Sequence, residues 1–152
     1  MKLGSANVTL SFNRNAPDVL LECSRMERPD YRKLVSLLET MNKEGGFFAS
    51  ILSRDDGLLM ASAVAPTSNR DLIAAMSGFL TDTAERVREE LSLGALKDIS
   101  IRCSKGKAVF RKIGSKDEQS LILAALMPRN VRYHNRPLGK AATRIRSLMG
   151  YR

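Results

Sequence analysis

The 152 residues of the chain are 43% hydrophobic and 27% charged, and the formal net charge is +9 at pH 7. These values predict one soluble globular domain with a substantial core, since the chain is too short for two domains of typical size. No apolar run approaches the roughly 18 to 20 residues of a membrane span, and the N-terminus lacks the apolar stretch of a secretory signal, so we expect a cytoplasmic protein.

Residues 1–28 are expected to form an N-terminal extension. Residues 8–12 and 18–24 have strand-like patterns on either side of a turn at 13–17. The extension could therefore add a strand to the sheet or form an arm over a neighbouring molecule, and the pattern does not choose between the two.

A helix is predicted over residues 29–43. Pro29 suits the first turn of a helix, and apolar residues follow at helical spacing until Gly45 and Gly46 end it.

The stretch SRDDGLLMAS, residues 53–62, contains two adjacent carboxylates, Asp55 and Asp56, between two apolar runs. Because Asp-Gly tolerates the positive φ angles of a type I′ turn, we interpret Asp56 and Gly57 as a two-residue hairpin turn. A metal or catalytic carboxylate pair is the less favoured alternative, since the only histidine, His134, has no spacing that relates it to this turn.

A long helix is predicted over residues 69–92. Its large apolar residues share one broad face, which is expected to cover the sheet. That face comprises Leu72, Met76, Phe79, Leu80, Ala84, Val87 and Leu91. The small residues Ala74, Ala75 and Gly78 lie elsewhere on the helix, where they could admit a second helix or be buried by the chain itself.

The rest of the chain predicts three strands and a helix. Residues 95–103 and 107–113 form a hairpin, and residues 120–127 form a central strand covered on both faces. Residues 135–149 form an amphipathic helix with a positive outer face. The order predicts an α+β fold, in which a five-stranded antiparallel sheet carries the long helix on one face and two helices on the other.

The two cysteines, Cys23 and Cys103, are far apart and have no CxxC spacing. We interpret them as buried free thiols of a reducing compartment rather than as a disulfide or a metal site. The alternation of Ile99, Ile101 and Cys103 places Cys103 in the core.

The order of elements and three stretches of sequence resemble the roadblock family, also called the dynein light chain roadblock type, whose architecture is related to longin and profilin-like folds. These stretches are ASILSRDDGLLMASAV, DLIAAMSGFLTDTAERVREELSLGALKDISIRCSKGKAVFRKIG and SLILAALM. The resemblance runs from about residue 30 to 149 and implies a roadblock-type domain over 29–149.

The resemblance implies a dimer, formed with a second copy or with another roadblock protein. Roadblock proteins join two sheets edge to edge through the strand that follows the long helix, here about 97–103, while the two long helices lie side by side. The implied interface residues are Ala74, Ala75, Gly78, Ile99 and Ile101. Members of the family serve as subunits of larger assemblies or as regulators of small Ras-like GTPases.

The sequence gives little support for an enzyme, and we expect no cofactor. It contains no GxxxxGK[ST], GxGxxG, GxSxG or HExxH motif. An arginine of the long helix, Arg86 or Arg88, could contact a GTPase in trans as an arginine finger does. Pairing of these arginines with Glu85, Glu89 and Glu90 on a solvent-exposed face is the favoured alternative.

The basic residues are concentrated near the C-terminus, where no acidic residue follows Met127. Four of them form a candidate partner-binding or anion-binding patch: Arg132, Arg136, Lys140 and Arg144. Nucleic acid, an anionic membrane surface or an acidic protein could bind such a patch. Nucleic-acid binding is the weaker hypothesis because the chain is only 5% aromatic, which gives bases few rings on which to stack.

Overall fold

The computed structural model describes residues 29–114 and 119–151. The elements follow in the order α2 (Tyr31–Gly45), β1 (Ala49–Arg54), β2 (Leu59–Ala63), α3 (Arg70–Glu90), β3 (Asp98–Arg102), β4 (Lys107–Ile113), β5 (Leu121–Met127) and α4 (Asn135–Leu148). Every element predicted between residues 29 and 149 is present within a few residues of its predicted bounds. The strand-like segments 8–12 and 18–24 and Cys23 lie outside the described residues.

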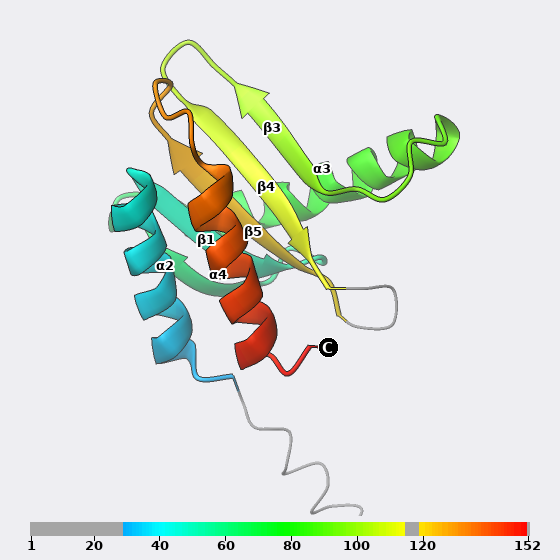
Figure 1. The fold of residues 1–152 in the computed structure, drawn as a ribbon. Helices are drawn as coiled ribbons and strands as arrows, with labels where there is room; N and C mark the ends of the chain where they lie inside the picture. The colour runs from blue at the N-terminus through cyan, green and yellow to red at the C-terminus, as the bar shows by residue number, and fades with distance from the viewer. Residues whose placement is uncertain (1–28, 115–118, 152) are drawn as a thin grey trace, which may run out of the picture.

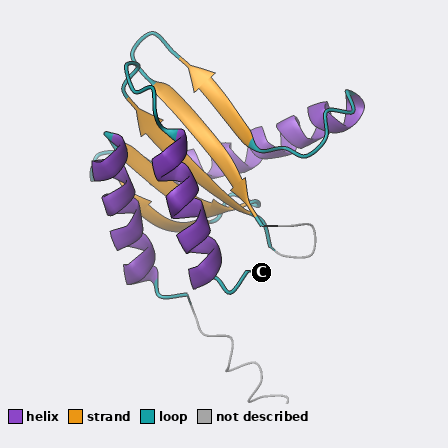
Figure 2. Ribbon diagram, viewed as in Figure 1, coloured by secondary structure: helices purple, strands orange, loops and turns teal. Residues whose placement is uncertain are grey.

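The five strands form one antiparallel sheet in the order β2-β1-β5-β4-β3. Helices α2 and α4 pack side by side on one face, and α3 crosses the other face (Figures 1 and 2). The predicted fold class is therefore confirmed. In this order β5 is the central strand and β3 is an edge strand.

Alternation along β5 divides its side chains between two cores. Leu121, Leu123, Ala125 and Met127 join the larger core under α2 and α4. Ile122 and Ala124 join the smaller core under α3, together with Ile51, Phe110 and Ala74. Both faces of β5 are covered, as predicted, and this explains why the strand is apolar along its whole length.

Helix α2 begins and ends at residues suited to those positions. The Asp30 carboxylate accepts hydrogen bonds from the backbone N–H of Arg32 at 3.1 Å and of Lys33 at 3.4 Å. At the other end, Gly46 has φ +67°, a left-handed conformation that glycine adopts without strain.

The β1–β2 hairpin is present, but the predicted type I′ turn is wrong. Of the two central residues only Gly57 has a positive φ, +85°. The turn is closed instead by a hydrogen bond from Gly57 N–H to Arg54 C=O at 3.0 Å, and the Asp56 carboxylate accepts one from Leu58 N–H at 3.1 Å. Asp56 also pairs with Arg54 at 2.8 Å. Asp56 thus has a structural role within the turn.

Helix α3 packs on the sheet mainly through its small residues, so the face predicted to cover the sheet is wrong except for Leu80, which packs against the smaller core. Ala74, Ser77, Gly78 and Thr81 are the buried residues of this helix. A Cβ atom at Gly78 would lie 2.9 Å from the Asp55 carbonyl oxygen and 3.0 Å from the Gly57 nitrogen. Gly78 therefore allows the helix to touch the backbone of the β1–β2 turn directly.

Cys103 is exposed rather than buried in the core, which corrects the sequence-based prediction. Strand β3 ends at Arg102, and Cys103 enters the turn to β4, where its N–H donates to Gly106 C=O at 2.8 Å. The strand, and with it the alternation of side chains between the two faces, ends one residue before Cys103, so Cys103 does not point into the core.

We predict that Gly78→Ala lowers the free energy of unfolding by about 1 to 3 kcal/mol, because the added methyl group forces α3 away from the turn. Chemical denaturation of both proteins measures the effect. Gly139→Ala on α4 is the matched control, since its new Cβ would meet only the Arg111 guanidinium, at an ordinary contact distance of 3.5 Å. This control should be neutral or stabilising by up to about 1 kcal/mol. Equal effects at the two glycines would contradict the close contact.

Candidate interaction surface

The outer face of α3 carries large apolar side chains that nothing in the described chain covers. We call Leu72, Met76, Phe79, Val87 and Leu91 the α3 outer face. Phe79 is 72% exposed and Leu91, just beyond the end of the helix, is 63% exposed. Soluble proteins seldom leave so many large apolar residues together in water, so this face has the character of a contact surface.

Strand β3 supplies an open sheet edge near this helix. It pairs with β4 on one side, and no strand of the described chain pairs with its other side. Ile99 is half-buried and packs against the smaller core, as does Leu80 of α3, whereas Ile101 is 37% exposed. An unpaired edge with apolar side chains is available to a strand of another molecule.

The predicted interface residues fall into two groups. Ala74 and Gly78 are buried within the chain, so they are not available to a second helix, and this part of the hypothesis is corrected. Ala75 is exposed on α3, and Ile99 and Ile101 lie on the open edge. The large apolar residues of the α3 outer face, which had been assigned to the core, take the place of Ala74 and Gly78 as candidates.

Arg86 and Arg88 of α3 lie in different surroundings. Arg88 donates to the carboxylate of Glu85, contacts Glu89 at 3.4 Å, and has a side chain only 22% exposed. Arg86 is 79% exposed and pairs with Asp82 at 3.2 Å. The predicted pairing with glutamates therefore holds for Arg88, while Arg86 pairs with a different acid one turn earlier.

Glu85 anchors this end of α3 to the sheet. The Lys112 ammonium on β4 lies 2.6 Å from one Glu85 carboxylate oxygen, and Arg88 donates to the other. Burial alone would raise the pKa of Glu85, but the hydrogen bonds from Lys112 and Arg88 outweigh it, so the pKa is lowered.

The structure divides the predicted basic patch. Lys140 on α4 pairs with Glu44 on α2 at 2.8 Å, and this hydrogen bond lowers the pKa of Glu44. Arg136 and Arg144 are exposed on α4, whereas Arg132 lies in the loop before this helix and lines a separate cavity. The four residues therefore do not form one continuous anion site.

Neither a membrane-crossing helix nor a metal-binding cluster is found in the described part of the chain. Among residues 29–114 and 119–151, no helix combines the length and hydropathy needed to cross a bilayer. Over the same ranges, no group of three or more His, Cys, Asp or Glu side chains is arranged to hold a metal ion.

Comparison with known proteins identifies the fold. No protein-family model and no curated protein sequence matches the chain. MglB of Myxococcus xanthus superposes with a TM-score of 0.73 at 11% identity, over 80% of this chain and 98% of that one. The gliding protein MglB of Thermus thermophilus gives 0.69 at 13% identity, over 79% and 90% of the two chains. A Roadblock/LC7 domain from Streptomyces avermitilis gives 0.69 at 14% identity, over 76% and 97%. The chain has a roadblock-type fold, as the sequence resemblance implied.

We predict that Glu85→Gln lowers the free energy of unfolding by about 1 to 2 kcal/mol at pH 7, because both cationic partners lose their counter-charge. A carboxylate whose pKa is lowered on folding contributes stability above its unfolded value of 4.5, and this contribution is lost as the pH falls through the folded value. The difference between the two proteins, measured by urea denaturation, should therefore shrink as the pH falls below 4.5 and through the lowered folded pKa of Glu85. Glu89→Gln, at a largely exposed side chain, is the control and should have little effect. A difference that does not change with pH would contradict the assignment.

Proposed function

We propose that this protein is a non-enzymatic interaction module that forms a dimer and regulates or scaffolds a small Ras-like GTPase. The observation that carries the proposal is the α3 outer face, a row of large apolar residues on a folded domain, next to an open sheet edge. The roadblock-type fold supports it, because the resemblance implies dimers and GTPase partners for this fold.

The dimer we propose is a twofold arrangement of identical chains. Two copies of β3 would pair through their open edges, and two copies of α3 would lie side by side with their outer faces in contact. Such an isologous contact uses the same residues twice, so each exposed apolar side chain gains a partner from one symmetry operation. A different roadblock-type chain could take the place of the second copy if it offered the same edge and helix.

The GTPase would bind a surface of the assembled dimer. Arg86 is the better candidate for a contact in trans, because its side chain is exposed and its pairing with Asp82 lies in solvent, where an ion pair contributes little. Arg88 would first have to leave Glu85. We therefore assign Arg88 to holding the Glu85 carboxylate, which pairs with Lys112 of the sheet, and Arg86 to partner contact.

Nucleic-acid binding through α4 is not favoured by the geometry. Lys140 is paired with Glu44, which reduces the net positive charge of the helix surface. Counterion release requires cations that remain available to several phosphates along a strand.

To test the interface, we predict that Phe79→Glu weakens the dimer by at least about 30-fold, because a carboxylate would be desolvated at the centre of the contact. Sedimentation velocity over a concentration series gives the dissociation constants. Tyr133→Glu is the control, since Tyr133 is 88% exposed and lies before α4, away from α3. Unchanged association of the Phe79 variant would exclude the α3 outer face.

To test the partner, tagged protein is used to capture partners from nuclease-treated cytoplasm of the source organism, and mass spectrometry identifies them. We expect enrichment of a Ras-like GTPase, with capture reduced for Arg86→Ala and retained for Arg70→Ala, an exposed arginine at the other end of α3. Purified GTPase then allows hydrolysis and exchange rates to be measured. Absence of any GTPase from the captured proteins would contradict the proposed function.

A further inference from the structure

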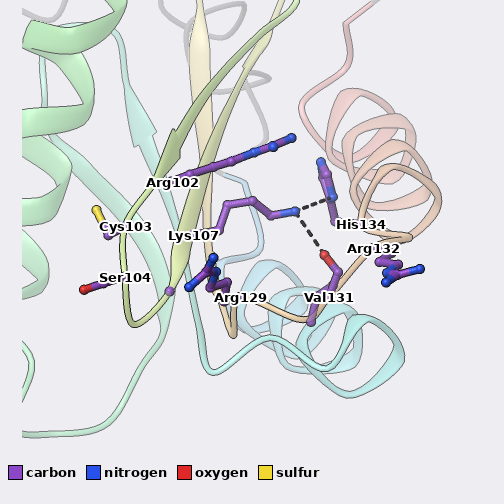
Figure 3. Close-up of a pocket in the computed structure, with 9 residues that line it drawn as sticks. Arg102, Cys103, Ser104, Lys107, Arg129, Val131, Arg132 and His134 are labelled. Atoms are coloured by element: carbon purple, nitrogen blue, oxygen red, sulfur yellow. Dashed lines mark hydrogen bonds between the residues drawn. The ribbon is translucent and has the colours of Figure 1, made fainter.

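A cavity of about 550 Å³ opens between the β3–β4 hairpin and the loop that connects β5 to α4. It is lined by Arg102, Cys103, Ser104, Gly106, Lys107, Arg129, Val131, Arg132 and His134. In Figure 3, Arg102 and Lys107 extend from the hairpin toward His134, whereas the side chains of Cys103 and Ser104 point the other way. The volume is within the range of about 300 to 1,000 Å³ typical of small-molecule sites.

The lining is strongly cationic. Arg102, Lys107, Arg129 and Arg132 contribute four positive charges, and no carboxylate lines the cavity. None of these four side chains forms an ion pair with an acid in the described part of the chain. The charge is therefore left available to a ligand.

Three other cations of β4 and α4 are paired with acids. Arg111, on the same strand as Lys107, donates to both carboxylate oxygens of Asp98 at 2.7 and 2.9 Å. Lys112 is paired with Glu85, and Lys140 with Glu44. These three cations are compensated by acids, whereas the four that line the cavity have no carboxylate partner among the described residues.

Lys107 is held in place by neutral groups. Its ammonium donates to the Val131 carbonyl oxygen at 3.0 Å and lies 3.1 Å from Nδ1 of His134 (Figure 3). Burial, followed by the charges of Lys107 and Arg111, lowers the pKa of His134, so this imidazole is neutral at pH 7. The ammonium is thus positioned without being neutralised, which is the arrangement a phosphate site requires.

We propose that this cavity binds a small anion that carries at least two phosphate groups. A single phosphate would leave most of the four positive charges uncompensated, whereas a diphosphate or triphosphate balances them. Guanidinium groups recognise phosphate oxygens in pairs, and the fixed Lys107 ammonium adds a point charge between the two segments. The cations surround one cavity instead of following a stripe, which favours a compact ligand over a nucleic-acid strand.

Bound ligand would join the β3–β4 hairpin to the loop before α4. Arg102 comes from the end of the edge strand β3, and Arg129 from the loop after the central strand β5. A polyphosphate that bridges them would connect two segments that are otherwise linked here through Lys107. This inference does not depend on the proposed GTPase partner.

The test is isothermal titration of the full chain with sodium tripolyphosphate at constant ionic strength. We expect saturable binding with one site per chain, and Arg129→Gln should weaken it by about tenfold or more, the loss expected for one charge-assisted contact. Arg144→Gln, which removes the same charge from α4 outside the cavity, should change the affinity by less than about twofold. Thermal unfolding of both variants establishes that they are folded.

Two results would overturn the proposal. One is the lack of saturable binding by the wild-type chain. The other is an equal loss of affinity in the Arg129 and Arg144 variants, which would indicate that only the general charge of the surface attracts the ligand.

A second experiment distinguishes a lipid headgroup from a free phosphate compound as the ligand. Co-sedimentation with vesicles of phosphatidylcholine and phosphatidylinositol bisphosphate, lost in Arg129→Gln and displaced by tripolyphosphate, would identify a lipid headgroup. Binding of tripolyphosphate with no vesicle binding would identify a free ligand.

Discussion

The contact between Gly78 and the β1–β2 turn determines which way α3 faces. An added Cβ would come within 3.0 Å of the turn backbone, so only glycine allows this approach. The neighbouring residues on the same side, Ala74, Ser77 and Thr81, are also small and are buried with it. Once this narrow side lies on the sheet, the large residues Leu72, Met76 and Phe79 must point into solvent. The close packing of the helix and its exposed apolar face are therefore two consequences of one constraint.

This orientation links the fold to the proposed function. A helix that covers a sheet with leucine and phenylalanine side chains has no apolar face left for a partner, whereas α3 leaves such residues exposed, where the proposed dimer would use them. Ile99 of β3 and Leu80 of α3 pack against the same smaller core, and the open edge of β3 could extend the sheet to a second chain. Glu85, held by Lys112 and Arg88, ties the C-terminal part of α3 to β4. A preformed face of this kind loses little conformational entropy when it binds.

The sequence was sufficient for the elements, the fold class and the central strand, because hydrophobic period and turn residues are local properties. It was not sufficient for the rotation of α3. A helical wheel assigns the face with the largest apolar residues to the core, but the close approach at Gly78 depends on the turn at Gly57, which is distant in sequence. Cys103 was misplaced because the end of β3 was set one residue too late. The cationic cavity was missed except for Arg132, since Arg102, Lys107 and Arg129 meet only through the pairing of β3, β4 and β5. The absence of acidic residues after Met127 was visible in the sequence, but the convergence of Arg129 and Arg132 with Arg102 and Lys107 was not.

In the proposed dimer, the exposed face of α3 binds another chain of the same kind. The most direct measurement is the molar mass of the wild-type protein by light scattering at micromolar concentration. We expect a species of twice the 16.8 kDa chain mass, which dissociates on dilution. A single species of 16.8 kDa at every concentration tested would contradict it.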